Sequence, residues 1–180
     1  MKKSVIMVLV ALLCVSAVFA ADNSVKLSVV PYGMQILTSS AQGQDAVHSR
    51  YGIGLEASYQ RKLVKGLFFE GGIGWNTFLM KDGRPKFTNL LAFAGLGYKF
   101  DITDRFACSV SADLGTDTLF YNGKVSETFT VKTGVNASYA VSDSVSIHIG
   151  CEGTFGFAQK KSTNFVNYRI LPSFGAGIEF

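Results

Sequence analysis

Every second residue from Val166 to Phe180, the last residue of the chain, is apolar, and most of the positions between them are polar or glycine. A period of two residues is the pattern of a β-strand whose two faces meet different surroundings. Most strands in folded proteins are only about 5–6 residues long, so an alternation held over this length predicts an unusually long strand. The rest of the chain is therefore expected to supply partners of similar length.

Seven earlier segments carry the same alternation, and after residue 20 no segment shows a helical period. Together with the last segment they predict an all-β fold of eight strands. In the first segment the apolar phase shifts after Pro31, which predicts a bulge at Val30-Pro31, and Asn122-Gly123 predicts a tight turn. The predicted strands cover residues 25–37, 51–61, 67–79, 87–100, 106–119, 128–141, 145–157 and 166–180.

The polar face of these strands carries glycine and small polar residues instead of dense charge. Only 17% of the residues are charged while 48% are hydrophobic, and we assign twelve of the 19 glycines to the polar face. A soluble barrel such as a lipocalin would present many Lys and Glu residues to water there, which disfavours that alternative. Small residues suit the inside of a narrow barrel, so the large apolar side chains are expected to point outward into lipid. The twelve glycines are Gly52, Gly54, Gly72, Gly74, Gly95, Gly97, Gly115, Gly134, Gly150, Gly156, Gly175 and Gly177.

The last eight residues resemble the insertion signal of bacterial outer-membrane β-barrels, in which a polar residue, a glycine, an apolar residue and a final aromatic residue recur at fixed spacing. Ser173, Gly175, Ile178 and Phe180 fill these four places. Strand number and chain length also resemble the small barrels of the OmpA, OmpX and OmpW type. The resemblance implies a closed eight-stranded antiparallel up-and-down transmembrane β-barrel in the outer membrane of a Gram-negative type bacterium. It further implies a monomer with both chain ends in the periplasm, in contact with outer-membrane lipid and lipopolysaccharide and inserted by the barrel-insertion machinery.

Three of the connections between predicted strands are short, and the others are mostly longer and more polar. Short turns at one rim and long loops at the other are typical of outer-membrane barrels. Pro31 and Pro172 fall on the first and last strands, so the seam between these strands is expected to lack some ladder hydrogen bonds. Aromatic residues near the short-turn rim predict an interfacial girdle. They are Tyr59, Tyr98, Phe100, Phe106, Tyr139 and Phe180.

The first 20 residues carry two lysines, a long apolar run and a small residue, Ala20, at the end. This pattern predicts a cleaved secretory signal over residues 1–20, followed by a single barrel domain over residues 21–180. Loss of the two lysines lowers the formal net charge from +4 to +2. That balance is too mild to imply a nucleic-acid partner.

Six charged residues on the polar face are expected to meet inside the barrel at one depth, with a histidine nearby. Lys132 and Glu152 should lie nearly opposite each other and form a direct ion pair, which Arg169 would complete as a triad. Glu56 and Glu70 should also face each other across the first short turn, and two facing carboxylates require a cation or a shared proton. The residues of this predicted charge network are Glu56, Glu70, Asp113, Lys132, His148, Glu152 and Arg169.

We predict that these charges fill and rigidify a narrow lumen, in a protein with a structural or surface-interaction role and without catalysis. One alternative is a porin-like channel for small solutes, mildly cation-preferring and gated as Lys132, Glu152 and Arg169 exchange partners. A lesser alternative is a port for hydrophobic ligands. The inward apolar residues that support the port are Leu91, Phe93 and Leu171.

A lipid-modifying enzyme is the alternative from another class, and the sequence disfavours it. His148 and Glu152 are four residues apart on one strand, about 13 Å, which is too far for a catalytic dyad. His48, with Asp45 and Ser49 beside it, fits a solvated loop histidine better. No pattern in the chain indicates a metal or a cofactor.

Two loops at the rim opposite the short turns carry basic residues. If these loops lie outside the cell, they would meet lipopolysaccharide phosphates or other anions. A solvated basic rim is the simpler interpretation. The basic residues are Lys81, Arg84, Lys86, Lys160 and Lys161.

Overall fold

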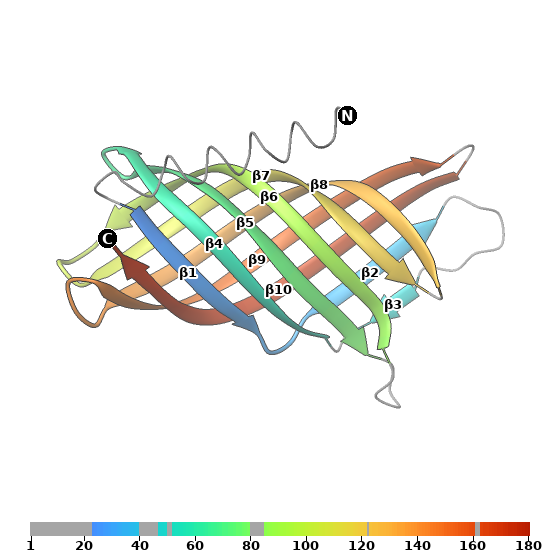
Figure 1. The fold of residues 1–180 in the computed structure, drawn as a ribbon, viewed down its shortest axis with the longest axis horizontal. Coiled ribbons are helices and arrows are strands. Elements are labelled where there is room, and N and C mark those ends of the chain that lie inside the picture. The colour runs from blue at the N-terminus through green and yellow to red at the C-terminus, as the bar shows by residue number, and fades with distance from the viewer. Residues whose placement is uncertain (1–22, 40–46, 50–51, 80–84, 122, 161–162) are drawn as a thin grey trace.

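The computed structural model describes residues 23–39, 47–49, 52–79, 85–121, 123–160 and 163–180. Within these residues, ten strand segments form one antiparallel sheet that curls into a closed barrel (Figure 1). The predicted signal, residues 1–20, lies outside them. No described helix is long and apolar enough to cross a membrane. The segments are β1 (Asn23–Val30), β2 (Met34–Ser39), β3 (Val47–Ser49), β4 (Gly52–Val64), β5 (Leu67–Leu79), β6 (Pro85–Asp101), β7 (Phe106–Tyr121), β8 (Lys124–Ala140), β9 (Val145–Lys160) and β10 (Thr163–Glu179).

The ten segments occupy eight strand positions, because two of the positions are divided. β1 and β2 both pair with β10 and are the two parts of the first strand. β4 pairs with β1 and β3 pairs with β2, so β3 and β4 together form the second strand. Each later strand pairs with its sequence neighbours, and β10 pairs back with β1 to close the sheet. The predicted closed eight-stranded antiparallel up-and-down barrel is confirmed.

The two rims of the barrel differ in what they carry. The near rim holds the start of β1, the C-terminus and the turns that precede β5, β7 and β9, as Figure 1 shows. The far rim holds the other ends of the strands. The aromatic residues predicted for a girdle lie on the outer face beside the near rim; among them, Tyr98 and Phe100 have ring centroids 4.7 Å apart.

The alternation in the sequence becomes the two faces of the barrel wall. Bulky apolar side chains point outward, and Ile73, for example, is 66% exposed, whereas polar side chains between them are buried in the lumen. Glycines assigned to the polar face lie against inward side chains. A Cβ added to Gly72 would meet the Phe93 ring, and one added to Gly175 would lie 2.8 Å from Nε2 of His148. Glycine therefore makes room for larger side chains across a narrow interior.

Most strands extend beyond the predicted bounds at the far rim. β8 begins at Lys124 and β10 begins at Thr163. β7 and β8 remain paired up to Tyr121 and Lys124, on either side of Gly123, whose φ of 71° favours glycine. The tight turn predicted at this place is confirmed, and β9 and β10 are likewise joined by only residues 161–162. For β7 and β8 the predicted strand ends at residues 119 and 128 fall short, and the longer loop predicted before the last strand is wrong, because these polar segments continue the ladder as hairpins.

The first strand is interrupted at residues 31–33, at the site of the predicted bulge. Val29 pairs with Phe174, and Met34 pairs with Ile170. The first strand therefore advances five residues where β10 advances four, and the extra residue reverses which side chains face the lumen. The predicted shift of phase after Pro31 is confirmed, and it takes the form of a break between β1 and β2.

We expect the seam between the first strand and β10 to be the least protected part of the wall. The register gives Leu171, Pro172 and Ser173 no partner on the first strand. Peptides covering residues 29–34 and 171–173 should exchange their amide hydrogens faster than peptides from β7 and β8, which pair without a break. Hydrogen–deuterium exchange of the folded protein in detergent, read by mass spectrometry, measures this difference. Equal exchange rates in these peptides and in the peptides from β7 and β8 would contradict the expectation.

Candidate functional site in the barrel lumen

A lysine buried in the middle of the lumen joins two carboxylates from distant parts of the wall. The Nζ atom of Lys132 on β8 lies 2.6 Å from Oε1 of Glu56 on β4 and 3.3 Å from Oε1 of Glu152 on β9. It also lies 3.6 Å from the centroid of the Phe93 ring, a cation–π contact. Only 2% of Lys132 is exposed, so these groups balance its charge in place of bulk water. The predicted pair of Lys132 and Glu152 is confirmed, and we call this group the Lys132 cluster.

Arg169 on β10 forms a second cluster with Asp117 on β7, and neither side chain has any exposed surface. The Nη2 atom of Arg169 lies 3.0 Å from Oδ2 of Asp117. The Nε atom of Arg169 donates to Oγ1 of Thr154 at 2.8 Å, and Nδ2 of Asn167 donates to Oδ2 of Asp117 at 3.1 Å. Among the described residues Arg169 makes no ion pair with Glu152, so the predicted triad is wrong. The staggered register of the tilted strands brings Arg169 to the far half of β7 instead.

The predicted network omits Asp117, although the sequence contains a signal for it. It follows Asp113 and Gly115 at the inward spacing of two residues, inside the predicted fifth strand. Its carboxylate is completely buried, and a buried carboxylate requires a cation or several hydrogen-bond donors. Only the register across the whole barrel identifies Arg169 as that cation.

Amide side chains extend the Arg169 cluster around the wall. Nε2 of Gln35 donates to Oδ1 of Asn167 at 2.8 Å, and Gln35 and Asn89 exchange two longer hydrogen bonds of 3.4 and 3.3 Å. Gln35 faces the lumen because the break in the first strand reverses the phase of β2. The Arg169 cluster therefore ties β2, beyond the break, to β6, β7, β9 and β10.

Glu56 and Glu70 do not face each other, contrary to the prediction. The hairpin between β4 and β5 turns at residues 65–66, so Glu70 pairs with Gln60, and Glu56 pairs with Gly74. Because β5 begins at Leu67, Glu70 lies three residues from the near rim. It therefore does not share the depth of the Lys132 cluster, and within the described residues it forms no ion pair. The buried Asp113 also has no ion pair there, and it accepts a long hydrogen bond of 3.5 Å from Ser111.

His148 meets Ser28 on the near-rim side of the Lys132 cluster. Oγ of Ser28 lies 2.9 Å from Nε2 of His148. The Nδ1 atom of His148 has no hydrogen-bond partner among the described residues, so no carboxylate orients the ring in the manner of a catalytic triad. His48 lies in β3, where its backbone pairs with Ile36, and Asp45 lies outside the described residues.

Apolar side chains fill another section of the lumen. The three residues expected to point inward do so, since Leu91, Phe93 and Leu171 are 3%, 6% and 1% exposed. They do not line an open path, because Phe93 lies under Lys132 and Leu171 belongs to a packed apolar cluster. A section filled with packed hydrocarbon is unfavourable for a hydrated ion. The apolar cluster consists of Val30, Phe78, Phe87, Leu119 and Leu171, with Leu37 against it.

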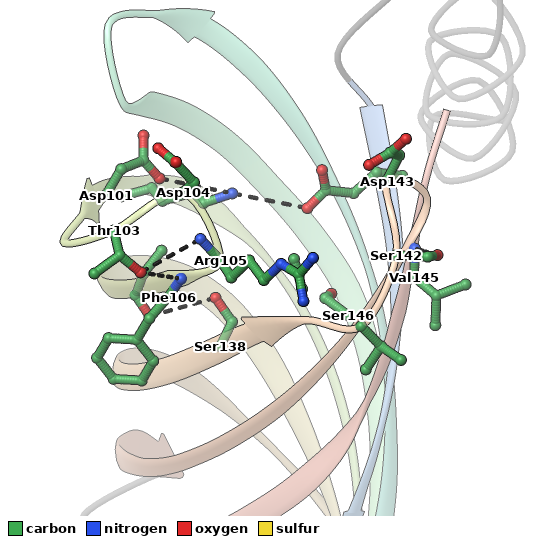
Figure 2. A pocket seen from close by; sticks show the side chains of 15 residues that line it. Asp101, Thr103, Asp104, Arg105, Phe106, Ser138, Ser142, Asp143, Val145 and Ser146 are labelled. Atoms are coloured by element: carbon green, nitrogen blue, oxygen red, sulfur yellow. Dashed lines mark hydrogen bonds and ion pairs between the residues drawn. The ribbon is translucent and has the colours of Figure 1, made fainter.

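A polar cavity of about 420 Å³ opens at the near rim, between the turns that precede β7 and β9. Figure 2 shows the side chain of Arg105 directed into this space, with Asp104 and Asp143 on the facing turns. At its edge, Nζ of Lys99 lies 4.0 Å from Asp101 and 3.7 Å from Glu179. These charged side chains are exposed or half-exposed, and their interactions are correspondingly weak.

Several predicted features of the far rim lie outside the described residues. Lys81, Arg84 and Lys161 fall outside them, while Lys86 and Lys160 are described only as backbone within β6 and β9. The predicted basic loops therefore stay a prediction. Among the described residues no group of three or more His, Cys, Asp or Glu side chains is arranged to hold a metal ion.

Comparison with known proteins places this architecture among outer-membrane barrels. No protein-family model and no curated protein sequence matches the chain. The solved structure of Neisserial surface protein A (NspA) matches 88% of this chain and 97% of its own, with a TM-score of 0.62 at 16% identity.

Two proteins of Pseudomonas aeruginosa match at similar coverage. The outer membrane protein OprG has a TM-score of 0.58 at 10% identity, over 89% of this chain and 96% of its own. The N-terminal β-barrel domain of OprF has a TM-score of 0.55 at 13% identity, over 89% of this chain and 100% of its own. Together with the closed antiparallel sheet, these likenesses show that the chain has the fold of the small outer-membrane β-barrels.

Proposed function

We propose that this chain is an integral outer-membrane protein with a closed lumen and a structural or surface-interaction role, without catalysis. The outward apolar face, the closed sheet edge and the likeness to outer-membrane barrels support the location, because lipid offers no partners to open strand edges. The first strand begins and the last strand ends at the near rim, so this rim faces the periplasm and the far rim faces outward.

The main observation in favour of a closed lumen is that buried side chains fill it. Lys132, Arg169 and Phe78 are 2%, 0% and 0% exposed, so the lumen contains paired charges and packed hydrocarbon where a channel would contain water. The charges link strands on opposite sides of the barrel, since β4 and β8 are four positions apart among eight. Such cross-links stiffen the wall, as expected of a structural barrel.

A small-solute channel is the second candidate, and one observation favours it. Lys132 is shared by Glu56 at 2.6 Å and Glu152 at 3.3 Å, so it has two partners between which it can move. A path through the barrel would also require the apolar cluster at Phe78 and Leu171 to separate. That second requirement makes the closed lumen the better supported reading.

In planar lipid bilayers the wild-type protein is expected to give no steady conductance, because paired charges and packed hydrocarbon occupy the lumen. The folded state is checked beforehand by its shift in gel mobility on boiling. A steady conductance that changes with Lys132→Gln but not with Lys99→Gln, a matched change at the near rim, would support the channel instead. A wild-type protein that dissolves as a compact monomer in plain buffer would contradict the membrane location itself.

A further inference from the structure

A groove crosses the outer face of the wall between two rows of outward side chains. The register across β4, β5 and β6 aligns both rows. A cavity of about 450 Å³ lies between them, and we call it the outer groove. One row contains Ala57, Ile73 and Ala92, and the other, nearer the far rim, contains Leu55, Trp75 and Leu90.

The depth of the outer groove comes from the small size of two residues. Ala57 and Ala92 pair directly with Ile73 from either side, and neither fills the space beside it. Leu55, Trp75 and Leu90 stand along the far-rim side of this hollow. Protein surfaces that face lipid carry an apolar band, so what fills a hollow in that band is hydrocarbon.

The outer groove becomes polar towards one end. It runs from Leu27 on β1 to Thr116 and Thr118 on β7. Thr118 pairs with Glu127 of β8, which is exposed on the same outer face. A charge on the lipid-facing side is costly at mid-membrane and tolerated near the interface, so Glu127 indicates that this end of the groove approaches the interface. The exposed apolar side chains of Phe120 and Val125 lie between it and the far rim. The groove thus runs from the middle of the wall towards interfacial depth, and its threonine end lies nearer the far rim, since Thr118 is close to the end of β7 at Tyr121.

We propose that the outer groove binds one acyl chain of a lipopolysaccharide molecule. This rests on the proposed outer-membrane function, under which the far rim meets the outer leaflet, where lipopolysaccharide resides. The alanine floor accepts the hydrocarbon. At the polar end, the hydroxyls of Thr116 and Thr118 and the carboxylate of Glu127 accept hydrogen bonds from the hydroxyl and amide N–H groups near the head of the acyl chains.

The test fills the groove without changing charge. Ala57→Leu combined with Ala92→Leu places two larger side chains on its floor, and Ala112→Leu combined with Ala137→Leu makes the same change on the outer face of β7 and β8, outside the groove. Purified barrels in detergent are titrated with lipopolysaccharide, and retained lipid is counted by native mass spectrometry. Trp75 is the only tryptophan in the chain and lines the groove, so a change in its fluorescence on titration is a second measure of binding at this place.

We expect one lipopolysaccharide per barrel for the wild type and the control, and binding at least about tenfold weaker for the groove-filling variant. Thr118→Val should weaken binding by up to about tenfold, the equivalent of one hydrogen bond. Equal binding by all variants, or displacement of lipopolysaccharide by an equal concentration of phosphatidylethanolamine, would overturn the proposal. In both of those cases a barrel that still shifts its gel mobility on boiling would leave the proposed membrane function standing.

Discussion

Lys132→Met should lower the free energy of unfolding by about 3–5 kcal/mol, the usual cost of leaving buried charge without its partner. The change keeps a long unbranched side chain but removes the cation that lies 2.6 Å from Glu56 and 3.3 Å from Glu152. Two carboxylates would then lie in the lumen without the charge that balances them. Urea-induced unfolding in detergent micelles, followed by the fluorescence of Trp75, measures the change in free energy.

The matched control is Lys99→Met at the near rim. The ion pairs of Lys99 are 3.7 and 4.0 Å long and its side chain is 42% exposed, so this change should cost at most about 1 kcal/mol. Adding Glu56→Gln and Glu152→Gln to Lys132→Met removes the unbalanced charges as well and should recover most of the lost stability. A Lys132 variant as stable as the Lys99 variant would contradict a buried and balanced charge in the lumen.

The fold is predictable from the sequence because its determinants are local. Alternation shows which side chains share a face, and its repetition along the chain gives the number of strands. Glycine on the polar face indicates that this face curls inward, so the sheet closes and residues such as Ile73 point outward. The break after Pro31 is also a local signal, since an extra residue reverses the apolar phase within the same segment.

The contacts inside the lumen are less predictable because they depend on the register around the whole barrel. Lys132 and Glu152 lie on adjacent strands joined by a short turn, and their pair is predicted correctly. The partner of Arg169 lies on β7, three positions away, where the strand tilt decides the depth at which side chains meet. An error of two residues in the position of a single turn, at residues 65–66, is enough to separate Glu70 from Glu56.

Arg169→Met is expected to cost about 3–5 kcal/mol of unfolding free energy, because it leaves the completely buried Asp117 without the guanidinium 3.0 Å away. Asp117→Asn alone should also be destabilising, since it leaves the guanidinium buried without a counter-charge. The two changes together should cost much less than the sum of the single changes, because neither charge then remains. Urea unfolding of the three variants and the wild type gives this coupling as a double-mutant cycle.

The loss of Arg169 should also speed amide exchange in the part of the first strand beyond the break. Gln35 holds β2 to this cluster through Asn167, so amide exchange in residues 34–39 should rise more in Arg169→Met than exchange in β8. Arg105→Met, at an exposed near-rim arginine, should change neither stability nor exchange by a comparable amount. Strictly additive costs in the cycle would show that Arg169 and Asp117 are not coupled, and exchange in residues 34–39 that does not rise in Arg169→Met would show that Gln35 holds β2 without help from Arg169.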